Sequence, residues 1–469
     1  MPSNNKQPTT NNALLFLLAA VCLLSPTGAA LSAPQSDQPA VSPVFQAVQE
    51  SGDWFKAVTD SSPEFLTIPA ALQNLEGEPF TVAKEAPTVD FVVYPEQVNP
   101  LVSKPFLWSL WGKGCLAPDG SFYSGIGDHG GPNGESFIYQ FDPSQNAIRK
   151  VFSFDKAMGH QPGDWGYGKL HGRLDIDEDG WIYFAGYWGA FPMPNELNQR
   201  YEGGAIARYN IYAHVSEEYG SPVPGVSWPI YATDTARGLM YLLGTDDSFA
   251  CYDVSAWSLR YHGSQDIQLG QRGLIVDTEK GVAYFCAKSP EGSRLAKYDP
   301  ESNSVTLTKA FVPADGTLRA ATDRRAADGC FYCMTMSGHL FRFDTETEEV
   351  EDLGFNFEKG HYTTTIGLSP GGRYLYYVPG AHGTCYNVRT PIVQYDIQSR
   401  QRKVLAFLED YYEAKYDYRF GGTFGLVVSS DGSTLFIPMN GSKVSEAGDQ
   451  SFGLPVLIAV HVPESERQE

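Results

Sequence analysis

From residue 107 onward, one pattern of polar and hydrophobic positions returns seven times along the chain. In each unit a polar turn with a glycine leads into an apolar strand rich in aromatic residues. The seven copies are APDGSFYSGI, DEDGWIYFAGY, TARGLMYLLG, TEKGVAYFCA, AADGCFYCMT, SPGGRYLYYV and SSDGSTLFIP. Gly accepts the positive φ of such turns, and Asp caps them. The pattern therefore predicts a repeated antiparallel unit.

A second strand that ends in its own turn follows in every unit, from SFIYQFDPSQ to LIAVHVPES. The turn glycines are 43 to 60 residues apart, which leaves room for four strands in each unit. Seven such units predict an all-β fold, a seven-bladed β-propeller of four-stranded blades. A repetitive sandwich or a β-helix is the alternative. The last unit lacks its outermost strand, and we expect TVDFVVYP, before the first unit, to supply it and close the ring.

The chain ahead of the repeats divides into two parts. A polar start, the apolar run ALLFLLAAVCLL and the small residues SPTGAALSA are typical of a signal peptide over 1–30. That run is too short to span a bilayer, so we expect a secreted or periplasmic protein without a membrane anchor. Residues 31–87 are predicted to form a partly helical extension, with helices in SPVFQAVQESGDWFKAVT and SPEFLTIPAALQNL. The propeller is predicted over 88–469.

Composition narrows the classes of partner. The net charge is −21 and only 19% of the residues are charged. Such a surface repels nucleic acid and anionic membranes, because phosphate binding needs clustered Lys and Arg. We expect a monomer. Six cysteines remain after the signal peptide, too few for a disulfide scaffold, and we expect buried free thiols, including Cys330 and Cys333.

Polar residues gather in one set of loops. The connections that would emerge on one face of the propeller are long and hold six of the nine histidines. The turns expected on the other face are short and plain. Because binding residues concentrate in loops on a rigid scaffold, we expect the site on the face with the long loops. These histidines are His129, His160, His171, His262, His361 and His382.

The starts of the innermost strands would ring the mouth of the central channel. The predicted ring is cationic and contains Lys169, His171, Arg173, Tyr231, Arg272, Arg319, His361 and Arg419. Arg is suited to carboxylate or sulfate, so the ring favours an anionic ligand. Aromatic residues near it would stack on sugar rings, namely Trp165, Tyr167, Tyr187 and Trp188. Together they indicate an acidic oligosaccharide or polysaccharide.

Several of these residues could have a structural role instead of binding a ligand. Arg173 is also placed to pair with Asp175 or Asp177, and Arg272 and Arg319 to form salt bridges between blades. His382 and Cys385, with His361, form a loosely spaced set for a structural divalent metal such as zinc, calcium being the other candidate. No other cofactor is indicated.

The architecture over 90–469 and its His, Tyr and Arg mouth resemble the propeller enzymes that attack uronic-acid glycans. These include oligogalacturonate lyases, ulvan lyases and rhamnose–glucuronate lyases. The resemblance lies in the architecture and carries no residue-by-residue motif. It implies a polysaccharide lyase that acts by β-elimination.

The chemistry of β-elimination suggests roles for the residues. Arg272 and Arg319, with Arg173, would hold the uronate carboxylate, where charge develops. His171 would remove H5 and Tyr187 would protonate the leaving O4, with His129 or His361 as substitutes. Three alternatives stay open. One is a glycoside hydrolase of the rhamnosidase or glucuronidase type, using carboxyl groups among Asp128, Asp164 and Glu202. The others are a metal-dependent lactonase and a non-catalytic propeller that binds glycan or protein.

Overall fold

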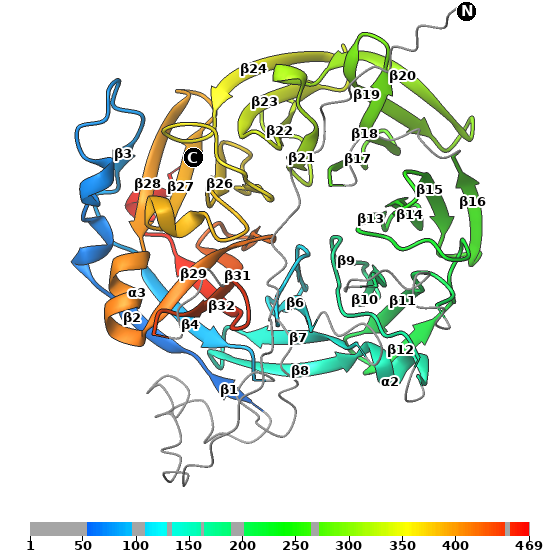
Figure 1. Cartoon of the computed structure of the whole chain (residues 1–469), viewed down its shortest axis with the longest axis horizontal. Helices are drawn as coiled ribbons and strands as arrows, with labels where there is room; N and C mark the ends of the chain where they lie inside the picture. The colour runs from blue at the N-terminus through cyan, green and yellow to red at the C-terminus, as the bar shows by residue number, and fades with distance from the viewer. Residues whose placement is uncertain are drawn as a thin grey trace, which may run out of the picture. The chain divides into compact units, whose positions relative to one another are not determined.

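Aromatic strands joined by short turns bury both of their faces when sheets pack against sheets, and here seven antiparallel sheets do so around one axis (Figure 1). The computed structural model describes residues 54–95, 108–128, 134–160, 164–188, 201–263, 272–445 and 451–468. Each sheet contributes four strands to its blade, which confirms the predicted all-β, seven-bladed propeller. All described residues belong to one compact unit, 42–469.

The blades follow one another along the chain, with the innermost strand first in each. Blade 1 is β5 (Cys115–Leu116), β6 (Phe122–Gly127), β7 (Ser136–Asp142) and β8 (Ala147–Ser153). Blade 2 is β9 (Asp175–Ile176), β10 (Trp181–Ala185), β11 (Ile206–Asn210) and β12 (Val215–Glu218). Blade 3 is β13 (Ile230–Asp234), β14 (Leu239–Leu243), β15 (Phe249–Asp253) and β16 (Ser258–His262).

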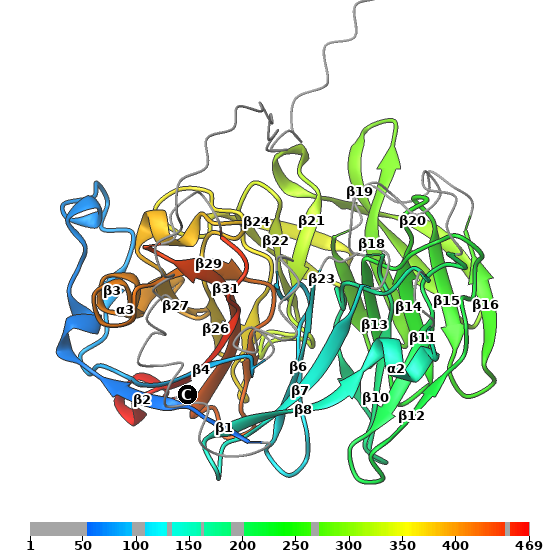
Figure 2. The same cartoon turned by 60° about the horizontal axis from the view of Figure 1, so that its bottom comes forward.

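The remaining blades keep this order. Blade 4 is β17 (Leu274–Asp277), β18 (Val282–Ser289), β19 (Gly292–Asp299) and β20 (Ser304–Phe311). Blade 5 is β21 (Leu318–Ala321), β22 (Phe331–Thr335), β23 (His339–Asp344) and β24 (Glu349–Phe355). Blade 6 is β25 (Gly367–Leu368), β26 (Tyr374–Tyr377), β27 (Pro391–Asp396) and β28 (Gln401–Phe407). Figure 2 shows the hairpin of β18 and β19 extending beyond the neighbouring blades.

Blade 7 combines both ends of the described chain. Its inner strands β29 (Tyr418–Thr423) and β30 (Val427–Val428) both pair with β31 (Thr434–Lys443), which pairs with β32 (Val456–His461). The outer neighbour of β32 is β4 (Thr88–Val93), in antiparallel register from Val456 opposite Val93 to His461 opposite Thr88. A side-chain contact joins the same two strands, because His461 Nε2 lies 2.6 Å from Asp90 Oδ2.

The segment before β4 differs from the predicted helical extension. Its described part holds the strands β1 (Phe55–Lys56), β2 (Val58–Ser61) and β3 (Thr81–Val82) and the short 3-10 turns η1 (Pro63–Leu66) and η2 (Ala70–Leu72). The predicted helix over 42–59 is wrong for its described end, which is β1 and the start of β2. β1 pairs with β8, β2 with β4 and β3 with β28. These blade edges offer unpaired backbone groups, and strand pairing there satisfies more of them than an isolated helix would.

Helices are few in the described residues. They are α2 (Phe154–Met158), α3 (Glu409–Tyr416) and the short 3-10 helices η5 (Pro313–Asp315), η6 (Cys385–Val388) and η7 (Glu464–Glu466). No helix in the described ranges is long and apolar enough to cross a membrane.

Aromatic rings fill the space between blades. Phe249 of blade 3 stacks on Phe285 of blade 4 with ring centroids 4.5 Å apart, and Phe122 of blade 1 stacks on Phe436 of blade 7 at 5.1 Å. The six cysteines from Cys115 to Cys385 are buried and free, as predicted. Burial raises their thiol pKa values, that of Cys251 to about 12.

We expect the contact between β4 and β32 to make stability depend on pH. Burial acts to raise the pKa of Asp90, but hydrogen bonds with His461, Thr59 and Asn146 prevail and hold it below its usual value. A lowered folded-state pKa adds stability above the unfolded-state pKa, and this stability is lost as the pH falls through the folded value. Asp90→Asn should therefore lower the free energy of unfolding by about 2 kcal/mol at neutral pH, with a smaller loss in acid.

Urea unfolding at a series of pH values between about 6 and 3 measures this dependence. Glu301→Gln, at an exposed turn, is the control and should leave the curve unchanged. An Asp90→Asn curve parallel to that of the wild type at every pH would contradict the prediction.

Candidate functional site

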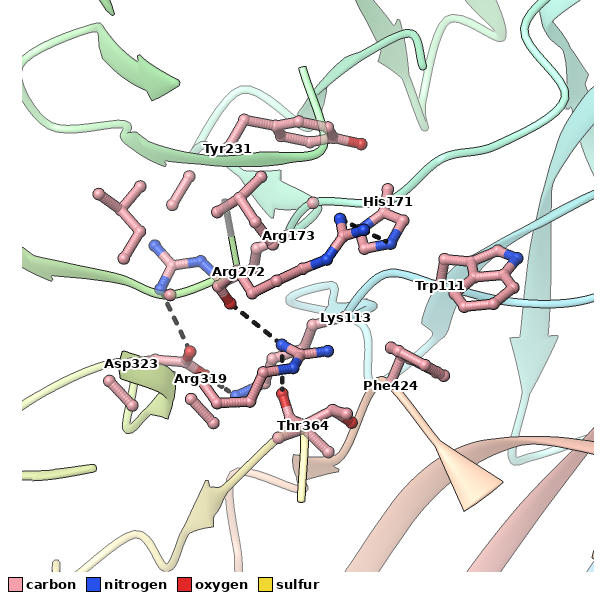
Figure 3. Close-up of a pocket in the computed structure, with 18 of the residues that line it drawn as sticks. Trp111, Lys113, His171, Arg173, Tyr231, Arg272, Arg319, Asp323, Thr364 and Phe424 are labelled. Atoms are coloured by element: carbon pink, nitrogen blue, oxygen red, sulfur yellow. Dashed lines mark hydrogen bonds and ion pairs between the residues drawn. The ribbon is translucent and has the colours of Figure 1, made fainter. Parts of the chain in front are cut away.

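The starts of the innermost strands converge on an open cavity at the propeller axis (Figure 3). We call it the axial cavity. Every blade contributes at least one residue from the beginning of its innermost strand or the turn before it. In blade order these are Lys113, His171 with Arg173, Tyr231, Arg272, Arg319, Thr364 and Phe424. The prediction that strand starts surround one mouth is correct for His171, Arg173, Tyr231, Arg272 and Arg319.

Glycine allows the innermost strands to approach closely. Lys113 N–H donates to the carbonyl of Gly172 at 3.1 Å, and Arg173 N–H donates to the carbonyl of Tyr231 at 2.9 Å. A Cβ atom at Gly172 would lie 2.5 Å from ring carbons of Tyr231, so a larger residue does not fit there. This packing of blades 1 to 3 fixes the backbone on both sides of Gly172, from which His171 and Arg173 extend.

Part of the positive charge at the axis is neutralised. Asp323 forms ion pairs with Lys113 and with Arg173, whose Nη1 lies 3.2 Å from Asp323 Oδ1. Arg173 Nε also lies 2.7 Å from Asp175 Oδ1, one of the pairings considered from the sequence. Burial acts to raise the pKa of Asp323, but Lys113 and Arg173 outweigh it and lower that pKa. Arg173 is therefore an ion-pair partner of Asp323 and Asp175 at the cavity wall.

Sequence reasoning missed Lys113 and Asp323. Lys113 occupies the same place before β5 as Arg173 does before β9, and the two residues form a parallel bridge. Comparison of equivalent positions between blades would have found Lys113. Asp323 follows β21 in an exposed turn, where nothing in the sequence distinguishes it from other turn carboxylates.

Three other cations have no carboxylate partner among the described residues, namely Lys169, Arg272 and Arg319. Arg319 Nε donates to the Tyr362 hydroxyl at 2.7 Å, and its Nη1 donates to the Arg272 carbonyl at 3.0 Å. Arg319 thus links blades through neutral acceptors and not through the salt bridge considered from the sequence. Lys169 Nζ lies 4.0 Å from the ring centroid of Trp111 and does not itself line the cavity.

Burial and the neighbouring Arg272 lower the pKa values of the other two cations, Lys169 and Arg319. Burial, followed by Arg272, lowers the pKa of Lys169 to about 7. Burial also lowers the pKa of Arg319, and Arg272 adds to this effect. No carboxylate of the described residues therefore pairs with these three cations next to the axial cavity, and an anion would relieve their positive field.

His171 lies in the middle of this field. It is 3% exposed, stacks on Trp111 with ring centroids 5.6 Å apart, and contacts the ring of Tyr187 edge-on at 5.5 Å. Its Nε2 atom lies 3.4 Å from Arg272 Nη1. Burial, then Arg272, Lys169 and Arg319, hold the pKa of His171 well below its usual value. Burial raises the pKa of Tyr187 despite Arg272. At neutral pH the imidazole is therefore uncharged and the phenol protonated.

Two of the aromatic residues predicted to stack on sugar are buried in the core of the protein. Trp165 and Tyr167 are 2% and 5% exposed. Trp165 Nε1 donates to the Trp188 carbonyl at 3.2 Å, and the Tyr167 hydroxyl donates to the Gly203 carbonyl at 2.7 Å. Trp188 stacks on Tyr187 and is also buried. The prediction that these three rings are accessible to sugar is wrong, because all three are buried.

Besides Lys169, two residues of the predicted ring do not line the axial cavity. His361 Nε2 lies 3.2 Å from Glu358 Oε1, and its backbone N–H donates to Asn356 Oδ1. Arg419 lies over the ring of Tyr386 and 3.5 Å from Glu413 Oε1. Each has a local partner that holds it elsewhere. The remaining candidate, His129, lies outside the described residues.

The residues considered for a metal have other neighbours. His382 stacks on Tyr362 at 5.3 Å and contacts Trp111 at 5.4 Å, so it belongs to the aromatic surroundings of the cavity. Cys385 Sγ donates to the Phe420 carbonyl at 3.2 Å. Within the described parts of the chain, no group of three or more His, Cys, Asp or Glu side chains is arranged to hold a metal ion.

Comparison with known proteins assigns the chain to no family. No protein-family model and no curated protein sequence matches it. Two solved structures that resemble it are the crystal structure of RRP9 WD40 repeats and the structure of U3-55K. Each is 11% identical and aligns over 76% of this chain and 96% of the other, with a TM-score of 0.48. The class that the observed topology defines is the seven-bladed β-propeller.

Asp323 neutralises Lys113 and Arg173, so its removal should leave these two cations to repel each other and lower stability. Because Asp323 is 45% exposed, we expect Asp323→Asn to lower the free energy of unfolding by only about 1 kcal/mol at low salt. The loss should shrink as NaCl screens the cations. Urea unfolding at low and high NaCl measures it, with Asp410→Asn on α3 as an exposed ion-pair control. A loss that does not change with salt would contradict this account.

Proposed function

We propose that this protein is a secreted or periplasmic carbohydrate-active enzyme that cleaves an acidic, uronate-containing oligosaccharide or polysaccharide by β-elimination. One observation carries the proposal. Lys169, Arg272 and Arg319, which lack carboxylate partners within the described residues, surround the uncharged imidazole of His171 and the protonated phenol of Tyr187. His171, Arg272 and Arg319 line the axial cavity. Tyr187 does not line it but contacts the ring of His171 edge-on, so that an anion acceptor, a base and an acid would lie next to one another.

Arg272 and Arg319 supply the charge that the reaction needs. Removal of H5 from a uronate places negative charge on the carboxylate in an enediolate-like transition state. The two guanidinium groups line the axial cavity on neighbouring blades and are connected through the Arg272 carbonyl. Positive groups held in place before the reaction stabilise that charge without reorganisation at the moment of transfer.

His171 and Tyr187 supply the two proton transfers. The His171 imidazole accepts H5, the electron pair of the C5–H bond forms the C4=C5 double bond, and the C4–O4 bond breaks. Tyr187 donates its proton to the departing O4. The states required of these groups are a neutral imidazole and a neutral phenol, and the shifts in their pKa values favour both.

A glycoside hydrolase is the alternative on the same fold, and the charges at the axis argue against it. Hydrolysis normally uses two carboxyl groups across the scissile bond. Among the described residues, Asp323 is the carboxylate that lines the axial cavity, and it is already paired with Lys113 and Arg173. The carboxylates considered from the sequence, Asp128, Asp164 and Glu202, do not line it. A non-catalytic glycan- or protein-binding propeller is the other alternative and is distinguished by experiment.

The decisive assay is the ultraviolet absorbance of the unsaturated uronate product. The purified protein is incubated with ulvan, pectin, alginate, glucuronan, gum arabic and glycosaminoglycans. We expect absorbance to rise with one of them. His171→Ala and Tyr187→Phe should each reduce the rate about 100-fold or more, because each removes a proton-transfer group. His361→Ala is the matched control, since His361 pairs with Glu358 away from the cavity, and it should stay active.

Each other outcome has a definite meaning. New reducing ends without a rise in absorbance would replace elimination by hydrolysis. Binding of a glycan without either signal would leave a non-catalytic propeller. An equal loss of activity in His361→Ala and His171→Ala would refute the placement of the site at the axial cavity.

A further inference from the structure

The contact between Arg272 and His171 has a consequence for the free protein. A guanidinium group carries only N–H donors, so the His171 Nε2 atom that faces it must present its lone pair. The proton of the neutral imidazole is then on Nδ1. That atom is buried and has no hydrogen-bond partner among the described residues. The electron pair that a base would use is therefore occupied before any ligand is bound (Figure 3).

We propose that Arg272 keeps His171 from accepting a proton until the carboxylate of a bound ligand engages the guanidinium group. This inference rests on the proposed function, in which Arg272 binds the carboxylate and His171 is the base. It adds that the two roles are coupled: a ligand with a carboxylate frees the base, and a neutral ligand does not. Arg272 is in this respect a positioning residue.

The charged groups around His171 act in the same direction. Lys169 precedes it on the same segment, Arg272 comes from blade 4 and Arg319 from blade 5, and all three disfavour the imidazolium form. The other cations that line the cavity, Lys113 and Arg173, are paired with Asp323. The remaining ring contacts of His171 are with neutral groups, Trp111, Tyr187 and Phe424. His382 lies against Trp111, and its pKa is lowered to about 4 by burial and by the same cations.

A carboxylate would change both conditions at once. Its two oxygens match the forked donors of Arg272, which draws the guanidinium away from Nε2 and releases the lone pair. Its negative charge also offsets the field of Lys169, Arg272 and Arg319, which makes a proton on His171 less unfavourable. A neutral sugar of the same shape supplies neither effect. Selectivity for uronates would therefore arise in the proton-transfer step as well as in binding.

The test follows His171 by NMR in the full folded protein labelled with ¹⁵N-histidine, with His171→Gln to assign its signals. The ligands are the monosaccharides glucuronate and galacturonate, which have no glycosidic bond to break, with glucose as the neutral match. In the free protein we expect the Nδ1–H tautomer and no protonation where exposed histidines titrate. The uronates should raise the His171 midpoint by about one pH unit or more, and glucose should leave it unchanged.

Arg272→Gln tests the same coupling without a ligand. Loss of the guanidinium should raise the His171 midpoint by a similar amount in the free variant, and glucuronate should then add little. Arg419→Gln, remote from the axial cavity, is the matched control and should behave like the wild type. An Nε2–H tautomer in the free protein, or an unchanged midpoint in Arg272→Gln, would overturn the proposal.

The outcomes separate this inference from the proposed reaction. If the midpoint shifts as expected while no glycan gives an unsaturated product, elimination fails and the coupling of Arg272 to His171 stands. If elimination is observed while neither glucuronate nor Arg272→Gln moves the midpoint, only the coupling fails.

Discussion

The closeness of the innermost strands at the axis is the constraint on which the rest of the structure depends. The inner strands of blades 1 to 3 begin within hydrogen-bonding distance of one another, since Lys113 N–H donates to the Gly172 carbonyl and Arg173 N–H to the Tyr231 carbonyl. Gly172 satisfies this constraint because any side chain there would collide with the ring of Tyr231. The same closeness brings one residue or more from every blade to a single cavity. The candidate site is thus a product of the packing geometry.

The cations in and next to that cavity fall into two groups, those with carboxylate partners and those without. Lys113 and Arg173 are balanced by Asp323 and Asp175, so they stabilise the fold and offer little to a ligand. Lys169, Arg272 and Arg319 are not balanced within the described residues, although the protein as a whole has a charge of −21. Buried cations without a carboxylate partner lower stability, and a bound anion would offset this loss. Burial, together with Arg272, Lys169 and Arg319, also disfavours a charged His171.

The sequence predicted the fold well because its signal is local and repeated. Seven glycine turns, each followed by an aromatic strand, leave few alternatives once the spacing is known. It also placed His171, Arg173, Tyr231, Arg272 and Arg319 at one mouth, since position in the repeat implies position at the axis. The predicted positions were wrong for loop residues whose side chains contact local partners instead of the cavity. His361 turns to Glu358, Arg419 to Glu413, and Trp165 and Tyr167 fold into the core of blade 2.

The sequence by itself therefore determined the architecture and the list of residues that begin the innermost strands, because turn chemistry and strand periodicity act over a few residues. Only the tertiary structure decided which cations are paired. The partners Asp323 and Arg173 are separated by 150 residues along the chain, and Arg272 and His171 by 101. No local pattern encodes such distances; they arise when the ring of blades brings distant strand starts together. Whether an arginine holds the fold or awaits a ligand is settled only at that stage.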